Sequence, residues 1–162
     1  MITVAMSVCI DAPASEVWAQ LARLEDIRFW SEAVVDARCE GVASRGVGAE
    51  RTCDLRGGIT VHERWVAWDE GRSFTYEGFG VPGVAQARNY WSVRPEGAET
   101  VLRSEAVVEL KGARITRLLE PIFARQVRRV GGRTLAAFKF LVENGTPPRG
   151  PHRRLPRAAA TC

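Results

Sequence analysis

The stretch VGAERTCDLRGGITVHERWVAWDEGRSFTYE, residues 47–77, decides the fold. Alternation of apolar and polar residues on both sides of Gly57-Gly58 predicts two antiparallel strands joined by a tight turn. A two-residue loop would place two arginines opposite each other, whereas a three-residue loop places Arg51 opposite Glu63. The second register also gathers the apolar side chains on one face. We therefore expect Arg51 and Glu63 to point toward the apolar face of the sheet.

The same alternation continues on both sides of this hairpin and predicts seven strands. They are expected at residues 2–10, 34–42, 49–55, 59–68, 73–79, 84–94 and 100–110. Because short turns separate the last six, we expect an antiparallel meander. Apolar residues at helical spacing predict two short helices between the first two strands, at about residues 13–24 and 25–31.

A long helical stretch follows the strands at residues 113–143. Pro121 and the pair Gly131-Gly132 interrupt its apolar stripe, so we expect bends there. Only this helix is long enough to cover one apolar sheet face. The sequence thus predicts an α+β domain at residues 1–145, in which a seven-stranded antiparallel sheet curves around a C-terminal helix. A sheet and helix arranged in this way leave a cavity suited to an apolar ligand.

Extending the register across the sheet assigns side chains to its inner face, and the helical stripe supplies the opposite wall. The cavity is expected to be lined by Arg51, Glu63, Trp65, Tyr76, Asn89, Trp91, Ser104, Leu119 and Phe123. No catalytic residue is assigned.

Several of these residues have both a structural and a functional interpretation. Arg51 and Glu63 form either an ion pair that fixes strand register, a polar anchor for a ligand, or an acid/base with a polarising cation. Tyr76 and Asn89 either contact each other across the cavity or orient a ligand carbonyl or hydroxyl. Trp65 either packs in the core or forms a platform for a ligand, and the same holds for Trp91.

The cysteines and histidines show no spacing typical of a metal site. Cys9, Cys39, Cys53 and Cys162 include no CxxC pair and have no histidine cluster beside them. We expect reduced, structural cysteines, no metal and no cofactor. The N-terminus lacks the features of a signal peptide and no apolar run is long enough to span a membrane, which indicates a cytoplasmic protein.

The net charge of +4 comes from the end of the chain. Residues 1–145 are neutral, and the excess lies in Arg149, Arg153, Arg154 and Arg157. Residues 146–162 are basic and rich in proline, so we expect a disordered tail. The arginines of the long helix form either a solvated face or a surface for an acidic carrier protein. No nucleic-acid partner is expected, because interleaved exposed aromatics are missing; a monomer and a homodimer are both compatible with the sequence.

Three segments and the hairpin together resemble a known family. IDAPASEVWAQL (10–21), IRFW (27–30), the 47–77 stretch and LAAFKFLVENG (135–145) are similar to the polyketide cyclase/dehydrase branch of the START and Bet v 1-like (SRPBCC) superfamily. The resemblance implies a helix-grip fold with a deep apolar cavity. The family's recurring arginine after the VGA turn, and its glutamate in the next strand, match Arg51 and Glu63.

Members of this family bind lipids, sterols, polyketides, quinones or plant hormones, and some catalyse cyclisation or dehydration. The resemblance and the apolar inner face together predict binding of a hydrophobic, lipid- or polyketide-like small molecule. The alternative is a polyketide aromatase/cyclase or dehydratase that uses the polar residues of the cavity. Because one fold supports many functions, the fold does not choose between them.

Overall fold

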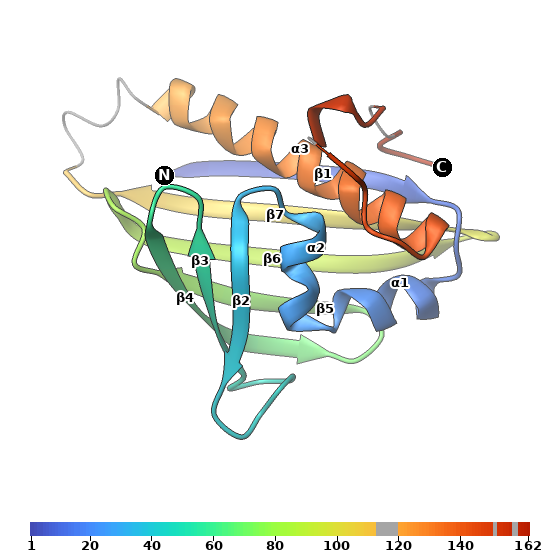
Figure 1. Cartoon of the computed structure of the whole chain (residues 1–162), viewed down its shortest axis with the longest axis horizontal. Helices are drawn as coiled ribbons and strands as arrows, with labels where there is room; N and C mark the ends of the chain where they lie inside the picture. The colour runs from blue at the N-terminus through green and yellow to red at the C-terminus, as the bar shows by residue number, and fades with distance from the viewer. Residues whose placement is uncertain (113–119, 151, 157–158) are drawn as a thin grey trace.

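The computed structural model describes residues 1–112, 120–150, 152–156 and 159–162 (Figure 1). The elements follow in the order β1 (Ile2–Ile10), α1 (Ala14–Leu21), η1 (Leu24–Asp26), α2 (Ile27–Trp30), β2 (Val34–Glu40), β3 (Glu50–Leu55), β4 (Ile59–Asp69), β5 (Ser73–Phe79), β6 (Val84–Glu96), β7 (Glu99–Leu110), α3 (Glu120–Asn144) and η3 (His152–Arg154).

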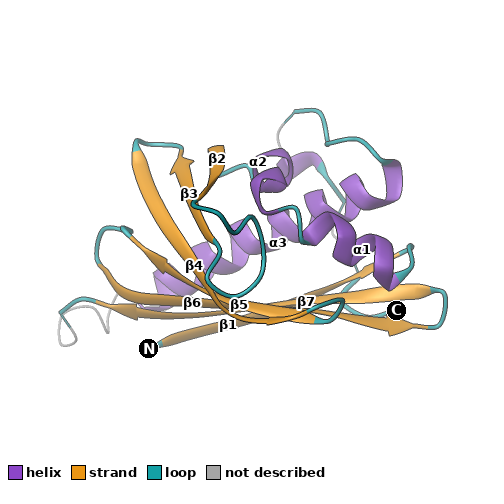
Figure 2. Cartoon of the chain, turned by 90° about the horizontal axis from the view of Figure 1, so that it is seen from below, coloured by secondary structure: helices purple, strands orange, loops and turns teal. Residues whose placement is uncertain are grey.

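The strands form one antiparallel sheet in the order β1-β7-β6-β5-β4-β3-β2. Helices α1, α2 and α3 lie on one face of this sheet, and strands β2–β4 curve toward them (Figure 2). Pairing irregularities at residues 34–36, 65–67 and 84–86 accompany this curvature, since extra residues bend and twist a strand. The predicted α+β helix-grip architecture is confirmed.

The register of the central hairpin is the one expected from charge pairing. Arg51 lies opposite Glu63, and Leu55 lies opposite Ile59. Because side chains alternate between faces, this register places Arg51, Glu63 and Trp65 on the face that the helices cover.

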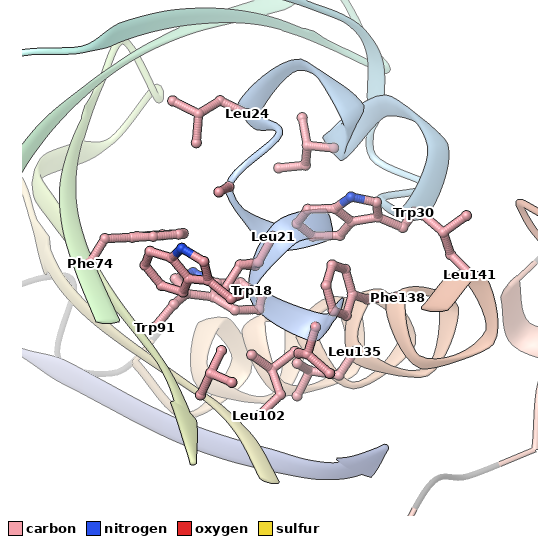
Figure 3. Packing of buried hydrophobic residues seen from close by; sticks show 14 of the residues in the cluster. Trp18, Leu21, Leu24, Trp30, Phe74, Trp91, Leu102, Leu135, Phe138 and Leu141 are labelled. Carbon is pink, nitrogen blue, oxygen red and sulfur yellow. The ribbon is translucent and has the colours of Figure 1, made fainter. Parts of the chain in front are cut away.

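Aromatic side chains from the sheet and the helices form the core beneath α1 and α2 (Figure 3). The Trp30 ring packs edge-to-face on Phe138 of α3, with centroids 5.1 Å apart, and on Trp91 of β6 at 5.9 Å. Trp18 of α1 packs on Phe74 of β5 at 5.9 Å. The two short helices therefore close one end of the space between sheet and α3.

Helix α3 continues through Gly131 and Gly132 without the expected interruption. Gly131 faces β1, where an added Cβ would lie only 2.1 Å from Cε of Met6. Glycine at this position allows helix and strand to approach closely, so it marks a contact rather than a break. Pro121 lies in the first described turn, where proline is tolerated. The earlier part of the expected helix, 113–119, lies outside the described residues.

The end of the chain differs from the disordered tail that its composition suggested. The backbone N–H of Cys9 donates to the carbonyl of Ala159 at 2.8 Å, and Ser7 Oγ donates to the carbonyl of Ala160 at 2.7 Å. Strand β1 is an edge of the sheet, so its outward N–H groups can donate to carbonyls of another segment. Leu155 also packs against the core.

The expectation of four reduced cysteines is wrong for one pair. Cys9 and Cys162 form a disulfide, while Cys39 and Cys53 are free. The partners are 153 positions apart in the sequence, and they meet only because the tail returns to β1. None of the helices in the described part of the chain is long and apolar enough to cross a membrane.

Candidate ligand-binding site

Arg51 and Glu63 form a buried ion pair on the inner face of β3 and β4. Nε and Nη2 of Arg51 lie 2.7 and 2.6 Å from Oε2 of Glu63, and the side chains are 3% and 10% exposed. The remaining guanidinium nitrogen, Nη1, donates to the carbonyl of Leu24. The pair therefore joins two strands of the sheet to the segment that carries η1.

Glu63 is engaged through only one of its two oxygens. Its Oε2 accepts from Arg51 and, at 3.5 Å, from the thiol of Cys53. No described residue donates to Oε1. Burial is the largest single effect and lowers the pKa of Arg51, but the charge and hydrogen bond of Glu63, together with Cys53 and Tyr76, raise the pKa overall, so the guanidinium stays charged. Glu63 can therefore hold Arg51 through Oε2 while its Oε1 contacts a ligand.

Cys53 lies beside this pair, and its thiol is unreactive as a nucleophile. Burial raises the pKa of its thiol to about 12, and the neighbouring Arg51 only partly opposes this effect. Because the thiolate is the nucleophile, a thiol that stays protonated near neutral pH is a poor one.

Two aromatic rings continue the inner face from the ion pair. The guanidinium carbon of Arg51 lies 5.0 Å from the Trp65 ring centre and 5.9 Å from that of Tyr76. Burial, followed by the charge of Glu63, raises the pKa of the Tyr76 hydroxyl, which therefore stays protonated. The indole N–H of Trp65 is buried and finds no hydrogen-bond acceptor in the part of the chain that the structure describes. These rings form an apolar floor with polar groups at its border.

Asn89 and Ser104 supply further polar groups on this face. Asn89 lies opposite Tyr76 and is half-buried, while Ser104 lies opposite Trp91 and is buried. The described residues provide no hydrogen-bond partner for either side chain. Buried polar groups are normally paired, so both are available to a ligand or to water.

Small residues occupy the row next to this floor. Gly78 lies opposite Glu63 on one side and Ala87 on the other. A Cβ added at Gly78 would make ordinary contacts with Ala87 and Val61 at 3.8 and 3.9 Å. Gly78 and Ala87 therefore place little side-chain volume on this part of the inner face.

A groove of about 610 Å³ lies where α3 begins. It is lined by Pro82, Gly83, Leu110, Ile122, Phe123, Arg125, Gln126 and Arg129. Ile122 is 67% exposed and lies next to the half-buried Phe123, so two neighbouring apolar side chains of the lining are left uncovered. The groove is therefore an accessible apolar surface with two guanidinium groups at its border.

The predicted lining residues divide between these two places. Arg51, Glu63, Trp65, Tyr76, Asn89, Trp91 and Ser104 share the inner sheet face, and Phe123 lies in the groove. Leu119 lies outside the described residues. Sequence patterns did not reveal the roles of Leu110, Ile122 or Pro82. Ile122 belongs to the apolar stripe of the helix, but the stripe alone does not say which members stay uncovered.

One group of three metal-ligand side chains occurs in the described residues. The donor atoms of Cys9, Glu99 and Cys162 lie within 4.8 Å of one another. The two sulfurs are joined as a disulfide, however, and thiolates rather than disulfides bind metal ions. In this oxidised state, the carboxylate of Glu99 is the one group of the three that can bind a metal ion.

His62 lies opposite Thr52 on the outer face of the sheet. Its Nδ1 lies 3.0 Å from Oγ1 of Thr52, which in turn donates to Glu40 at 2.5 Å. The hydroxyl proton is therefore directed to the carboxylate, and Nδ1 of His62 must be the donor to Thr52. Thr52 is 1% exposed, so its hydroxyl is out of reach of a substrate. This chain of hydrogen bonds stabilises strand pairing and does not form a nucleophile.

Comparisons with known proteins agree with this geometry. A family model described as polyketide cyclase/dehydrase and lipid transport matches residues 1–143. Similar solved structures include XoxI from Bacillus cereus, with 14% identity, 89% of this chain and 97% of that chain covered, and a TM-score of 0.74. No curated protein matches the sequence.

Two further structures have the same architecture. A START superfamily protein from Mycobacterium smegmatis is 14% identical over 89% of this chain and 99% of its own, with a TM-score of 0.71. The Zhui aromatase/cyclase from a Streptomyces species is 18% identical over 87% and 93%, with a TM-score of 0.70. At these identities the likeness shows a shared fold alone.

Proposed function

Since the chain belongs to the polyketide cyclase/dehydrase and lipid transport family, we propose that it binds an apolar small molecule between the sheet and α3. The ligand enters at the groove beside Phe123 and extends over Gly78 and Ala87. Its inner end reaches Tyr76 and Asn89.

The observation that supports this proposal most is the uncovered apolar surface of the groove. Ile122 is largely exposed, Phe123 is half-buried, and both face a volume of about 610 Å³. Pockets of 300–1,000 Å³ with apolar walls and a few polar groups are typical of small-molecule sites, in rough terms. Covering this surface with a ligand would remove apolar area from water.

The strand geometry suggests an elongated ligand. Val84 lies next to the groove and Asn89 lies at the aromatic floor, and the five residue steps from one to the other advance about 16 Å along β6. The unpartnered groups of Asn89 and Glu63 would meet a polar atom at the inner end of the ligand. Most of its length would contact small and apolar side chains.

A cyclase or dehydratase is the second candidate. One observation favours it: Oε1 of Glu63 has no donor among the described residues, so it could accept a substrate proton. Against it, Oε2 already accepts from Arg51 and Cys53. If the protein converts a β-ketoacyl thioester to a cyclised product, Glu63→Gln should abolish the product while binding persists. Product formation by that variant at the wild-type rate would remove this candidate.

The binding proposal is tested with a dansyl-labelled undecanoic acid, whose fluorescence rises in an apolar site. Phe123→Ala should weaken binding about tenfold, since a buried aromatic contributes roughly 1.5–3 kcal/mol. Ala87→Leu should weaken it as well by filling the row beside Gly78. Val35→Ala, an exposed apolar change on β2, is the control.

Loss of binding in Phe123→Ala and Ala87→Leu, with Val35→Ala unchanged and the melting temperatures similar, would support the site. Absence of any fluorescence change with the wild-type protein, together with no co-purified small molecule in native mass spectrometry, would contradict it. A cytoplasmic location, an acidic carrier protein as partner, and a monomeric or homodimeric state remain predictions from the sequence.

A further inference from the structure

The groove has a charge imbalance that its apolar walls do not explain. Arg125 and Arg129 line it, and no acidic side chain does. Neither arginine makes an ion pair with a described residue. The nearest acidic residue on the helix, Glu120, is bound to the N-terminal amino group of Met1 at 3.0 Å.

Arginines on the sheet behave differently. Oppositely charged side chains lie within 2.8 Å of the guanidinium in each of these cases: Arg38, Arg51, Arg64, Arg88, Arg94 and Arg103. The strand arginines thus have acidic partners, whereas none of the arginines of α3 (Arg125, Arg128, Arg129 and Arg133) forms an ion pair with a described residue. Of these four, Arg125 and Arg129 line the apolar groove. Spaced four residues apart on one helix face, these two also repel each other weakly.

An anion between the two guanidinium groups would remove this repulsion. Guanidinium nitrogens form a planar fork that matches a carboxylate or a phosphate, and hydrogen bonds between such charged groups are stronger than neutral ones. Ile122 and Phe123 lie on the same first turns of α3 and would contact an attached apolar chain. One helix face therefore offers both an anion site and an apolar wall.

We propose that the ligand of this groove is an anionic amphiphile, whose carboxylate or phosphate head binds Arg125 and Arg129 while its apolar chain lies against Phe123 and Leu110. This inference rests on the proposed function, since it names the class of ligand that the same site takes. The head stays at the entrance, and the chain points toward the aromatic floor, where a polar atom at its far end would meet Asn89 and Glu63.

Two probes of the same length separate charge from apolar contact. Dansyl-labelled undecanoic acid carries the anionic head, and the matching dansyl-labelled primary alcohol does not. Both are titrated into the full chain, as wild type and as Arg125→Gln, Arg129→Gln and the double variant. Arg128→Gln is the matched control, because Arg128 is exposed on the same helix but does not line the groove.

The double variant should bind the acid about tenfold or more weakly, as expected for loss of charge-assisted hydrogen bonds. It should bind the alcohol within about twofold of wild type, and Arg128→Gln should change neither affinity by more than that. In the wild type, added salt should weaken binding of the acid more than binding of the alcohol. The difference in affinity between the two probes should therefore shrink as the salt concentration rises. Competition between dodecyl phosphate and laurate then shows which head binds better, and either result is consistent with the proposal.

Three results would overturn the inference. If the double variant loses affinity for both probes equally, the arginines shape the groove and do not bind the anionic head. The proposed apolar site would still stand in that case. If it keeps full affinity for the acid, the arginines serve another partner, such as an acidic protein. If Arg128→Gln weakens binding of the acid as much as the double variant does, the acid responds only to the overall charge of the helix. Failure of both probes to bind the wild type contradicts the proposed function itself.

Discussion

The C-terminal half of α3 is buried, and its N-terminal half is not. Leu135, Ala137, Phe138 and Leu141 belong to the core, whereas no residue from 120 to 134 is buried. Figure 3 shows Phe138 and Leu135 facing the aromatic cluster of the sheet and the short helices. The apolar stripe runs through both halves. The difference lies in what faces it, since α1 and α2 cover only the C-terminal half.

This contrast suggests a division between stability and binding along one helix. The buried half holds the sheet, the short helices and the tail together, and Lys139 adds a hydrogen bond to the carbonyl of Cys9 at 2.7 Å. The other half presents Phe123 and two unpaired arginines to the groove. Substitutions in the two halves should therefore affect different measurements.

The largest effect is expected from Phe138→Ala. Phe138 is fully buried and packs on Trp30, so the substitution should lower the free energy of unfolding by about 3–5 kcal/mol. Phe123→Ala should lower it by about 1 kcal/mol or less, because that side chain is half-exposed. Urea unfolding of both variants measures the difference, and equal losses would contradict the division.

The disulfide should give the next largest effect. Cys162→Ser should lower the free energy of unfolding by about 2–4 kcal/mol, because the bond closes nearly the whole chain. It should leave dansyl-undecanoate affinity unchanged, since the tail packs beside the buried half of α3. Cys39→Ser, at a free cysteine, is the control. Thiol titration should find two free cysteines in the unfolded, unreduced wild type; four would show that the bond is absent.

A smaller effect should distinguish the two adjacent glycines in the middle of α3. Nothing lies within 4 Å of a Cβ added at Gly132, so Gly132→Ala should raise the free energy of unfolding by up to about 1 kcal/mol. Gly131→Ala should gain less or lose stability, because Met6 must move. Met6→Ala should restore the gain in the double variant. Equal gains at both glycines would show that the close approach to β1 is not a constraint.

The smallest expected effect is a pH dependence at His152. Burial lowers its pKa below the ordinary value of 6.5, and its buried Nδ1 has no hydrogen-bond partner among the described residues. The unfolded chain therefore takes up a proton at higher pH than the folded one, so stability is present above pH 6.5 and falls as the pH drops below it. Glu32, Arg56 and Arg133 are the charged groups that act on this ring.

His152→Gln should flatten the stability profile between about pH 7 and pH 5, and His62→Gln is the control at an exposed histidine. Thermal unfolding across this range measures both. A decline of the same size in wild type and His152→Gln would assign the pH dependence to other groups.

The strand register and the inner face could be predicted from residue patterns alone. The alternation around Gly57-Gly58 and the opposite charges of Arg51 and Glu63 leave one favourable pairing, and the structure adopts it. The same alternation along the strands places Trp65 and Tyr76 on the inner face. These features depend on neighbours in sequence or on one adjacent strand, so local spacing contains the information.

Other features depend on which surfaces meet in space. The bond between Cys9 and Cys162 requires the tail to return to the edge strand, and no spacing rule relates two residues 153 positions apart. Composition suggested a disordered tail because a basic, proline-rich segment cannot form its own core. In the structure, Ala159 and Ala160 of this segment hydrogen-bond to β1, a partner that composition alone does not reveal.

The sequence by itself determined the fold and the apolar inner face, because both follow from a repeat of two residues and from charge pairing between adjacent strands. Only the tertiary structure decided which half of the long helix is covered. Helical periodicity identifies an apolar face but does not say what lies opposite it. The groove at Phe123, with Arg125 and Arg129, lies on the part of α3 that no short helix covers.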